Sequence, residues 1–196
     1  MPTIEIAELL VGIQRAFKPL KLRWYVFGAQ AVIAAGAVRA TADLDITTDD
    51  VPVDVLRKAL APLGFKLRDD IEGVEDLVAH HRILPLVHRS SGYQLDVVRA
   101  GPGLEQEMLA RVKLRRVGRV QVPFVSTDDL VVLKIIASRP KDLEDARVLL
   151  DVARDELDVR VIRERLAEFG SLIDDSTLVA TLDRLTGEPP RSRRRR

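Results

Sequence analysis

The chain has 196 residues, 46% of them hydrophobic, and its 31 basic and 30 acidic side chains leave a formal net charge of +1. That length and apolar content suit one compact α/β domain with a helical appendage. The absence of cysteine excludes disulfides and thiolate metal sites, and neither a membrane-length apolar run nor an N-terminal signal is present, so we expect a cytoplasmic protein without membrane contact.

Hydrophobic periodicity and turn residues predict a sheet-forming region followed by helices. An apolar stripe predicts a helix over residues 4–17, residues 24–27 read as a buried strand, and a short small-residue helix over 29–35 ends at Gly36. A strand near 44–47 precedes a helix that Pro52 opens and Gly64 ends. Further strands are expected at 83–88, 94–98 and 114–122, and further helices at 128–138, 141–154, 160–169 and 176–185.

This order of elements predicts an α/β (α+β) fold, in which a mixed β-sheet is flanked by helices and followed by a C-terminal helical bundle. We expect residues 1–125 to form the catalytic domain and residues 126–187 to form the helical region. Residues 188–196, which include four consecutive arginines at the end, are expected to form a basic, disordered tail.

A glycine turn followed by two closely spaced carboxylates is the most informative local pattern. Gly28 lies at a strand-to-helix junction, where the first amides of the helix are free to bind a phosphate. Asp43 and Asp45 are two positions apart in the next strand, so their side chains project from the same side. A divalent cation such as magnesium relieves the repulsion between such charges. Asp-x-Asp pairs also occur on solvated strand edges, so the pair alone leaves that alternative open.

Gly28-Ala29, a spacer and Asp43-x-Asp45 resemble the signature of the polymerase-beta-type nucleotidyltransferase superfamily. The run from Arg39 to Asp45 is most similar to small bacterial branches of that superfamily. These branches are the abortive-infection type E (AbiEii-like) toxins, the related mycobacterial tRNA-modifying toxins and the compact aminoglycoside nucleotidyltransferases. The second motif residue of the family is often serine, whereas Ala29 here offers a backbone amide but no hydroxyl.

Asp96 is the candidate for a third carboxylate. It lies among apolar β-formers in the predicted strand at 94–98, where an alternating pattern would also be satisfied by an acid that simply points outward. The resemblance implies a third aspartate on a neighbouring strand that completes the metal site, and Asp96 has the matching place along the chain. It also implies that this residue is a possible acceptor for the proton of the attacking hydroxyl.

The resemblance also implies a helix lysine that faces the triphosphate, and Lys134 is the candidate. Ser126 and Asp129 have capping-box spacing at the start of its helix, and Lys134 lies off the predicted buried stripe, which consists of Leu130, Leu133, Ile136 and Ala137. A Lys-Asp-x-x-Asp element similar to that of the family follows at 141–145. Its acids lie in a first helical turn, where the helix dipole favours negative charge irrespective of function.

Taken together, the resemblance implies metal-dependent transfer of a nucleoside monophosphate from an NTP to a hydroxyl acceptor. It implies that Asp43, Asp45 and Asp96 bind two Mg²⁺ ions, with Mn²⁺ as the alternative, and that Asp43, Asp45, Asp96 and Lys134 are the catalytic residues. The nucleotide-binding residues are then Gly28, Ala29, Arg39 and Lys134. The expected acceptor is RNA, most plausibly tRNA, and the expected role is that of a toxin with a cognate antitoxin protein. An aminoglycoside-type small-molecule transferase and a non-catalytic nucleotide- or partner-binding member are the alternatives.

Two basic runs are candidate contacts for an anionic partner. One spans residues 111–119 in the predicted hairpin, where alternation would place Arg111, Lys113 and Arg115 on one face. The other is the tail at 191–196. Exposure of charged side chains to solvent is an equally simple explanation for either run. A basic surface around Lys113 and Arg115 beside the carboxylates would favour RNA, whereas an acidic pocket would favour aminoglycosides, which are cations.

Overall fold

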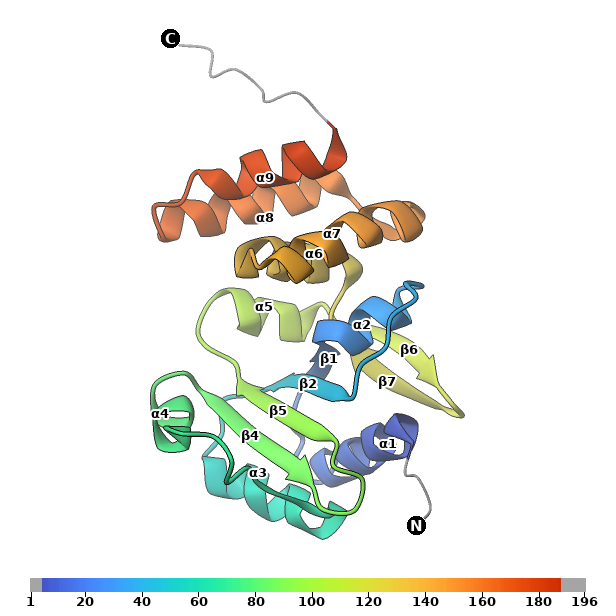
Figure 1. Cartoon of the computed structure of the whole chain (residues 1–196), viewed down its shortest axis with the longest axis vertical. Coiled ribbons are helices and arrows are strands. Elements are labelled where there is room, and N and C mark those ends of the chain that lie inside the picture. Colours follow the sequence, from blue (N-terminus) through green and yellow to red (C-terminus); the bar gives the residue numbers. More distant parts are fainter. Residues whose placement is uncertain (1–4, 188–196) are drawn as a thin grey trace. The chain divides into compact units, whose positions relative to one another are not determined.

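The computed structural model describes residues 5–187, which divide into two compact units (Figure 1). In this part of the chain the first unit comprises residues 5–34 and 39–125, and the second comprises residues 35–38 and 126–187. The arginine-rich run at 191–196 lies outside the described residues. Within 5–187, no helix combines the length and the apolar character needed to cross a membrane.

A seven-stranded mixed sheet with the strand order β3-β4-β5-β2-β1-β7-β6 forms the first unit. The pairs β2·β5 and β1·β7 are parallel, and the other neighbouring pairs are antiparallel, as predicted for a mixed sheet. The strands are β1 (Trp24–Phe27), β2 (Asp43–Thr48), β3 (Phe65–Leu67), β4 (Ile83–His88), β5 (Gln94–Arg99), β6 (Lys113–Val117) and β7 (Val120–Phe124).

The helices of the first unit are α1 (Ile6–Phe17), α2 (Gly28–Ala34), α3 (Val53–Leu60), α4 (Val74–Ala79) and α5 (Leu104–Ala110), with a 3-10 turn at Ala61–Leu63. Three elements, β3, α4 and α5, were not predicted from the sequence. All three are short, and α4 and α5 start from Gly73 and Gly103 without a side-chain cap. Periodicity over so few residues carries little signal.

Alternating side chains in β2 and β5 separate an apolar core from a polar face. Leu44 and Ile46 in β2 are at most 1% exposed, as are their register partners Leu95 and Val97 in β5. Helices α1 and α3 lie side by side and supply further buried side chains (Figure 1). The residues between these apolar positions therefore project from the opposite face of the sheet.

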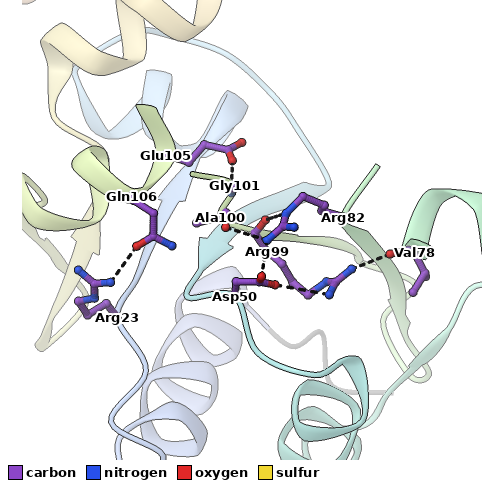
Figure 2. A network of polar contacts seen from close by, with 9 residues as sticks. All are labelled: Arg23, Asp50, Val78, Arg82, Arg99, Ala100, Gly101, Glu105 and Gln106. Carbon is purple, nitrogen blue, oxygen red and sulfur yellow. Dashed lines mark hydrogen bonds and ion pairs between the residues drawn. The ribbon is translucent and has the colours of Figure 1, made fainter. Parts of the chain in front are cut away.

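An arginine network fixes the ends of β2 and β5 that lie far from Asp43 (Figure 2). Arg82 donates to the carbonyl oxygens of Arg99 and Ala100, both at 2.9 Å, and pairs with Asp50 at 2.6 Å. Arg99 also pairs with Asp50, at 3.5 Å, and donates to the carbonyl of Val78 in α4 at 2.7 Å. The network thus ties α4 to the loop after β2 and to the end of β5.

The hairpin predicted between residues 114 and 122 is confirmed, because β6 and β7 pair and meet at a turn containing Gly118 with φ of 60°. Arg111 lies outside this hairpin because it ends α5, where its guanidinium pairs with Glu107 at 3.0 Å. The prediction that Arg111 shares a strand face with Lys113 and Arg115 is therefore wrong. The missed helix α5 uses the residues immediately before the hairpin.

The second unit is helical, as predicted. It contains α6 (Thr127–Ala137), α7 (Pro140–Val152), α8 (Val159–Leu172) and α9 (Thr177–Thr186), with a 3-10 turn at Arg154–Glu156. The capping prediction at the start of α6 is confirmed, because Ser126 Oγ accepts from the Asp129 amide at 3.2 Å and donates to the Asp129 carboxylate at 2.7 Å. Asp129 is fully buried and pairs with Arg165 of α8 at 2.8 Å.

Candidate active site

Three aspartates lie on the polar face of two neighbouring strands. Asp45 in β2 is in register with Asp96 in β5, and Asp43 is in register with Gln94. Directly paired residues on adjacent strands project from the same face, as do residues two positions apart in one strand. Asp43, Asp45 and Asp96 therefore share the face opposite the buried core.

Gly28 lies against this carboxylate group. Its predecessor Phe27 is in register with Asp45, and Gly28 itself has φ of 63° at the point where β1 passes into α2. A Cβ atom added to Gly28 would lie 1.9 Å from Asp45 Oδ2, a distance at which atoms overlap. The backbone at Gly28 thus approaches the carboxylate as closely as only glycine permits. Ala29 follows as a buried residue at the beginning of α2.

Asp96 combines partial burial with an unpartnered carboxylate oxygen. It is half-buried, and its Oδ1 atom is a buried oxygen that accepts no hydrogen bond from the described residues. Burial raises the pKa of Asp96, the nearby Arg68 guanidinium opposes that shift, and the negative charge of Asp43 adds to it. An acid held in this way gains from a cation or from a proton.

Arg68 and Gln94 complete the polar face and were missed by sequence reasoning. The Arg68 amide donates to the carbonyl of Pro85, which is itself in register with Asp96, so Arg68 continues the same row of residues across the sheet. Its guanidinium donates to Gln94 Oε1 at 2.8 Å and to Asp70 at 3.2 Å. No signal in the sequence identifies Arg68, because the strand that positions it has three residues.

The donor set suits a hard cation. In residues 5–187 no group of three or more His, Cys, Asp or Glu side chains that could hold a metal ion is present. Magnesium, however, is usually bound through one or two carboxylates together with water and substrate phosphates. The paired Asp45 and Asp96, with the unpartnered Oδ1 of Asp96, fit that mode of binding.

Arg39 and Thr41 lie in the segment that leads into β2. Thr41 Oγ1 accepts a hydrogen bond from the Asp43 amide at 3.1 Å, which orients the first residue of the strand. Arg39 is half-buried, belongs to the first unit and already interacts with another residue of the chain. Its predicted contact with a nucleotide stays a prediction.

Lys134 belongs to the second unit, where two acids of α7 hold its amine. Lys134 Nζ lies 2.8 Å from Asp142 Oδ1 and 2.8 Å from Asp145 Oδ2, and its side chain is only 9% exposed. The predicted stripe on α6 is wrong, because Lys134 is buried while Ala137 is exposed. Ion pairing explains how a lysine occupies a buried position. The Lys-Asp-x-x-Asp element thus supplies the partners of Lys134.

Asp142 shows the opposite electrostatics to Asp96. Its side chain is completely buried, which disfavours ionisation, yet hydrogen bonds from Arg139 and Lys134 outweigh burial and hold the pKa of Asp142 below its usual range. The second unit therefore contains an internally neutralised cluster, consisting of Lys134, Asp142, Asp145 and Arg139.

Solved structures similar to this chain have the same fold at low sequence identity. One is the antibiotic-resistance factor ANT(2'')-Ia in complex with adenylyl-2''-tobramycin, with 16% identity, a TM-score of 0.58, and 85% of this chain and 98% of that chain covered. Another is the lincosamide antibiotic adenylyltransferase LnuA with lincomycin bound, with 16% identity, a TM-score of 0.55, and coverage of 77% and 99%. A third is an antigenic nucleotidyltransferase-like protein from Paracoccidioides brasiliensis, with 17% identity, a TM-score of 0.50, and coverage of 93% and 95%.

These likenesses identify the architecture, a mixed sheet flanked by helices, as the nucleotidyltransferase fold. No curated protein matches the chain. A protein-family comparison matches residues 5–180 to the family described as "Nucleotidyltransferase of unknown function (DUF6036)". The match covers most of the chain, including both units and all three aspartates of the polar face. The chain therefore belongs to this family and is a nucleotidyltransferase.

Proposed function

We propose that the protein transfers a nucleoside monophosphate from an NTP to a hydroxyl group of RNA, specifically tRNA, and releases pyrophosphate. The observation that carries this proposal is the row formed by Asp45 and Asp96 on parallel strands, with Asp43 beside them and Gly28 against Asp45. Carboxylates grouped on one face, one of them with the unpartnered oxygen Asp96 Oδ1, next to a backbone that nothing larger than glycine could replace, suit a site for a metal-bound triphosphate.

The roles of the residues follow from their places. Asp43, Asp45 and Asp96 would hold Mg²⁺, or alternatively Mn²⁺. Two ions are the expected number. When bound, the metal neutralises phosphate charge and lowers the barrier to displacement. The amides at Gly28 and Ala29 bind a phosphate, and Arg39 binds the nucleotide.

Asp96 is placed to act on the acceptor. The acceptor oxygen forms a bond to the α-phosphorus as the bond to pyrophosphate breaks, and the proton of the hydroxyl passes to the carboxylate of Asp96. Partial burial and the raised pKa of Asp96 support this role, because an acceptor with a higher pKa takes the proton more readily.

Lys134 is proposed to contact the triphosphate by exchanging an ion pair. Its amine has two acidic partners, and a phosphate oxygen offers the same type of contact as either carboxylate. One partner remains to orient the amine while the other is replaced. The ion pairs would then keep Lys134 charged and extended before the nucleotide binds.

We further propose that the enzyme is the toxin of a cytoplasmic toxin–antitoxin pair and has a protein antitoxin as its partner. The run Arg39-x-Thr41-x-Asp43-x-Asp45, which resembles that of the abortive-infection type E toxins, supports this role. Thr41 of that run accepts a hydrogen bond from the Asp43 amide, and this bond orients the first residue of the carboxylate pair.

A small-molecule acceptor is the second candidate. The three acids on the polar face would attract a cationic aminoglycoside. The likeness to ANT(2'')-Ia and to the lincosamide adenylyltransferase makes antibiotics the compounds to test.

One labelling experiment tests both candidates. The full chain is incubated with Mg²⁺, each NTP labelled at the α-phosphate, and either total tRNA or a panel containing tobramycin and lincomycin. We expect label in tRNA, and its absence with Asp45→Asn. Label on an antibiotic alone would replace the RNA proposal with the second candidate. Absence of label from tRNA and from every compound of the panel would overturn both candidates.

A further inference from the structure

We propose that the β6–β7 hairpin is the surface that binds the phosphate backbone of the RNA acceptor. This inference rests on the proposed function, since it names how that acceptor is held. Hairpin and carboxylates belong to the same unit and the same sheet, so the strand order sets how many strands separate them (Figure 1). The register places Leu114 and Arg116 on the face of the carboxylates and Lys113 on the opposite face, so the edge hairpin presents cations on both of its sides.

The hairpin region has charge of one sign. Residues 111–125 contain five basic side chains and no acidic one. Arg111 pairs with Glu107, and Arg115 donates to the carbonyl of Ala34 at 3.1 Å. Lys113, Arg116 and Arg119 are exposed and form no ion pair with any residue of 5–187. These three, which we call the hairpin cations, are uncompensated positive charge.

Protection of a sheet edge is the rival explanation, because β6 is an edge strand and charged residues discourage edge-to-edge pairing. The opposite edge shows what protection requires in this protein. At β3, Lys66 pairs with Asp69 at 3.0 Å and the following Arg68 pairs with Asp70 at 3.2 Å. Paired charges of both signs therefore protect the edge at β3. The excess of positive charge at β6 instead favours an anionic partner.

The spacing suits a strand of nucleic acid. From β2, which holds Asp43 and Asp45, the sheet passes through β1 and β7 to β6. Three strand spacings amount to about 14 Å. A stacked strand advances about 3.4 Å along its axis per phosphate, so an RNA end at the carboxylates reaches the hairpin after about four nucleotides. Leu114, 65% exposed between two basic residues, offers an apolar contact for a sugar or base.

The test compares two triple variants of the full chain with equal loss of charge. The first is Lys113→Gln/Arg116→Gln/Arg119→Gln. The control removes three other exposed cations without ion pairs in the described residues, as Arg15→Gln/Lys18→Gln/Lys58→Gln. Affinity for labelled tRNA is measured from 50 to 200 mM salt, together with affinity for NTP and for poly-glutamate.

We expect the hairpin variant to lose tRNA affinity and the slope of log affinity against log salt to fall by about 2, because each phosphate contact contributes about 0.7. The control variant and NTP affinity stay unchanged. Unaltered tRNA binding, or aggregation as the sole effect, overturns the proposal in favour of edge protection. Loss of poly-glutamate binding with tRNA binding intact overturns it in favour of an acidic protein partner.

The outcome is separable from that of the proposed function. If the hairpin variant loses tRNA binding while wild type never transfers label to tRNA, the docking surface stands and the proposed function fails. If wild type and hairpin variant label tRNA with the same KM for tRNA, the proposed function stands and the docking surface fails.

Discussion

Each unit of the protein contains a group of acidic side chains, and the two groups differ in how the protein neutralises their charge. In the second unit, Lys134 lies 2.8 Å from both Asp142 and Asp145, and the pKa of Asp142 is lowered. In the first unit, Asp96 leaves an oxygen without a partner and its pKa is raised. Acids that serve the fold carry their own cation, whereas Asp96 on the polar face keeps an oxygen that a cation from outside could use.

The largest expected effect is on catalysis in the first unit. Asp45→Asn removes a charge from the polar face with little change in shape, so we expect transfer to fall by about a thousandfold or more. Thermal unfolding measured alongside should show a fold at least as stable as wild type. Asp142→Asn is the matched variant, in which stability should fall instead. Substantial transfer by Asp45→Asn would remove the contrast between the two groups.

Lys134→Met tests the neutralised cluster. It removes the cation that Asp142 and Asp145 share and leaves Asp142 paired with Arg139, and the loss of one partner from a buried ion pair typically costs about 3–5 kcal/mol in the free energy of unfolding. The triple variant Lys134→Met/Asp142→Asn/Asp145→Asn should recover part of that loss, because the unpaired charges are gone. Chemical denaturation of both variants measures the difference.

Kinetics of the same variants separate the two roles of Lys134. If the amine also contacts the triphosphate, the triple variant remains impaired in transfer although its stability has recovered. A Lys134→Met protein of wild-type stability would instead show that the cluster contributes nothing to the fold.

Gly28→Ala tests the close approach to Asp45. The new methyl group would overlap the carboxylate, and a displacement of about 1 Å at a reacting centre can lower turnover about a hundredfold. Gly36→Ala is the matched control, because Gly36 also has positive φ but nothing lies within 4 Å of its added Cβ. That control should lose about 1 kcal/mol of stability and keep its turnover. Equal turnover in both alanine variants would show that the contact with Asp45 is dispensable.

Sequence alternation was enough to place Asp43 and Asp45 on one face, because the two-residue period holds in any strand. It could not reveal that Asp45 is in register with Asp96, since register depends on which strands become neighbours. Arg68 escaped detection because a three-residue strand has no measurable period. The register of Asp45 with Asp96 and the position of Arg68 both depend on contacts between residues that lie far apart in the sequence.

Lys134 shows a different limit. Its burial contradicts the usual exposure of lysine, and the acids that explain it lie in a separate helix beyond the break at Pro140. The helices themselves were predicted well, because apolar spacing, the cap at Ser126 and the proline are local signals. A pairing between two such helices is visible only once they pack.

The two acid groups should also differ in how they make the stability of the protein depend on pH, although this effect is small. The folded-state pKa of Asp96 is raised, because ionisation of the half-buried acid is unfavourable. The stability that the protonated acid contributes is therefore fully present below the unfolded pKa and declines as pH rises through the folded pKa. The pKa of Asp142 is lowered, so its stabilisation is present above the unfolded pKa and is lost as pH falls through the folded pKa. Asp96→Asn should therefore raise the Tm at pH 8, and Asp142→Asn should lower it.

Thermal unfolding in EDTA from pH 3 to pH 8 measures both changes without bound metal. The gain from Asp96→Asn should shrink as the pH falls, because the wild-type acid is then protonated. The loss from Asp142→Asn should shrink over the same range for the same reason. Addition of Mg²⁺ at pH 8 should raise the Tm of wild type but not of Asp96→Asn, since only wild type retains the charge that the cation compensates. Differences of the same sign for both variants would mean that the two acid groups are electrostatically alike.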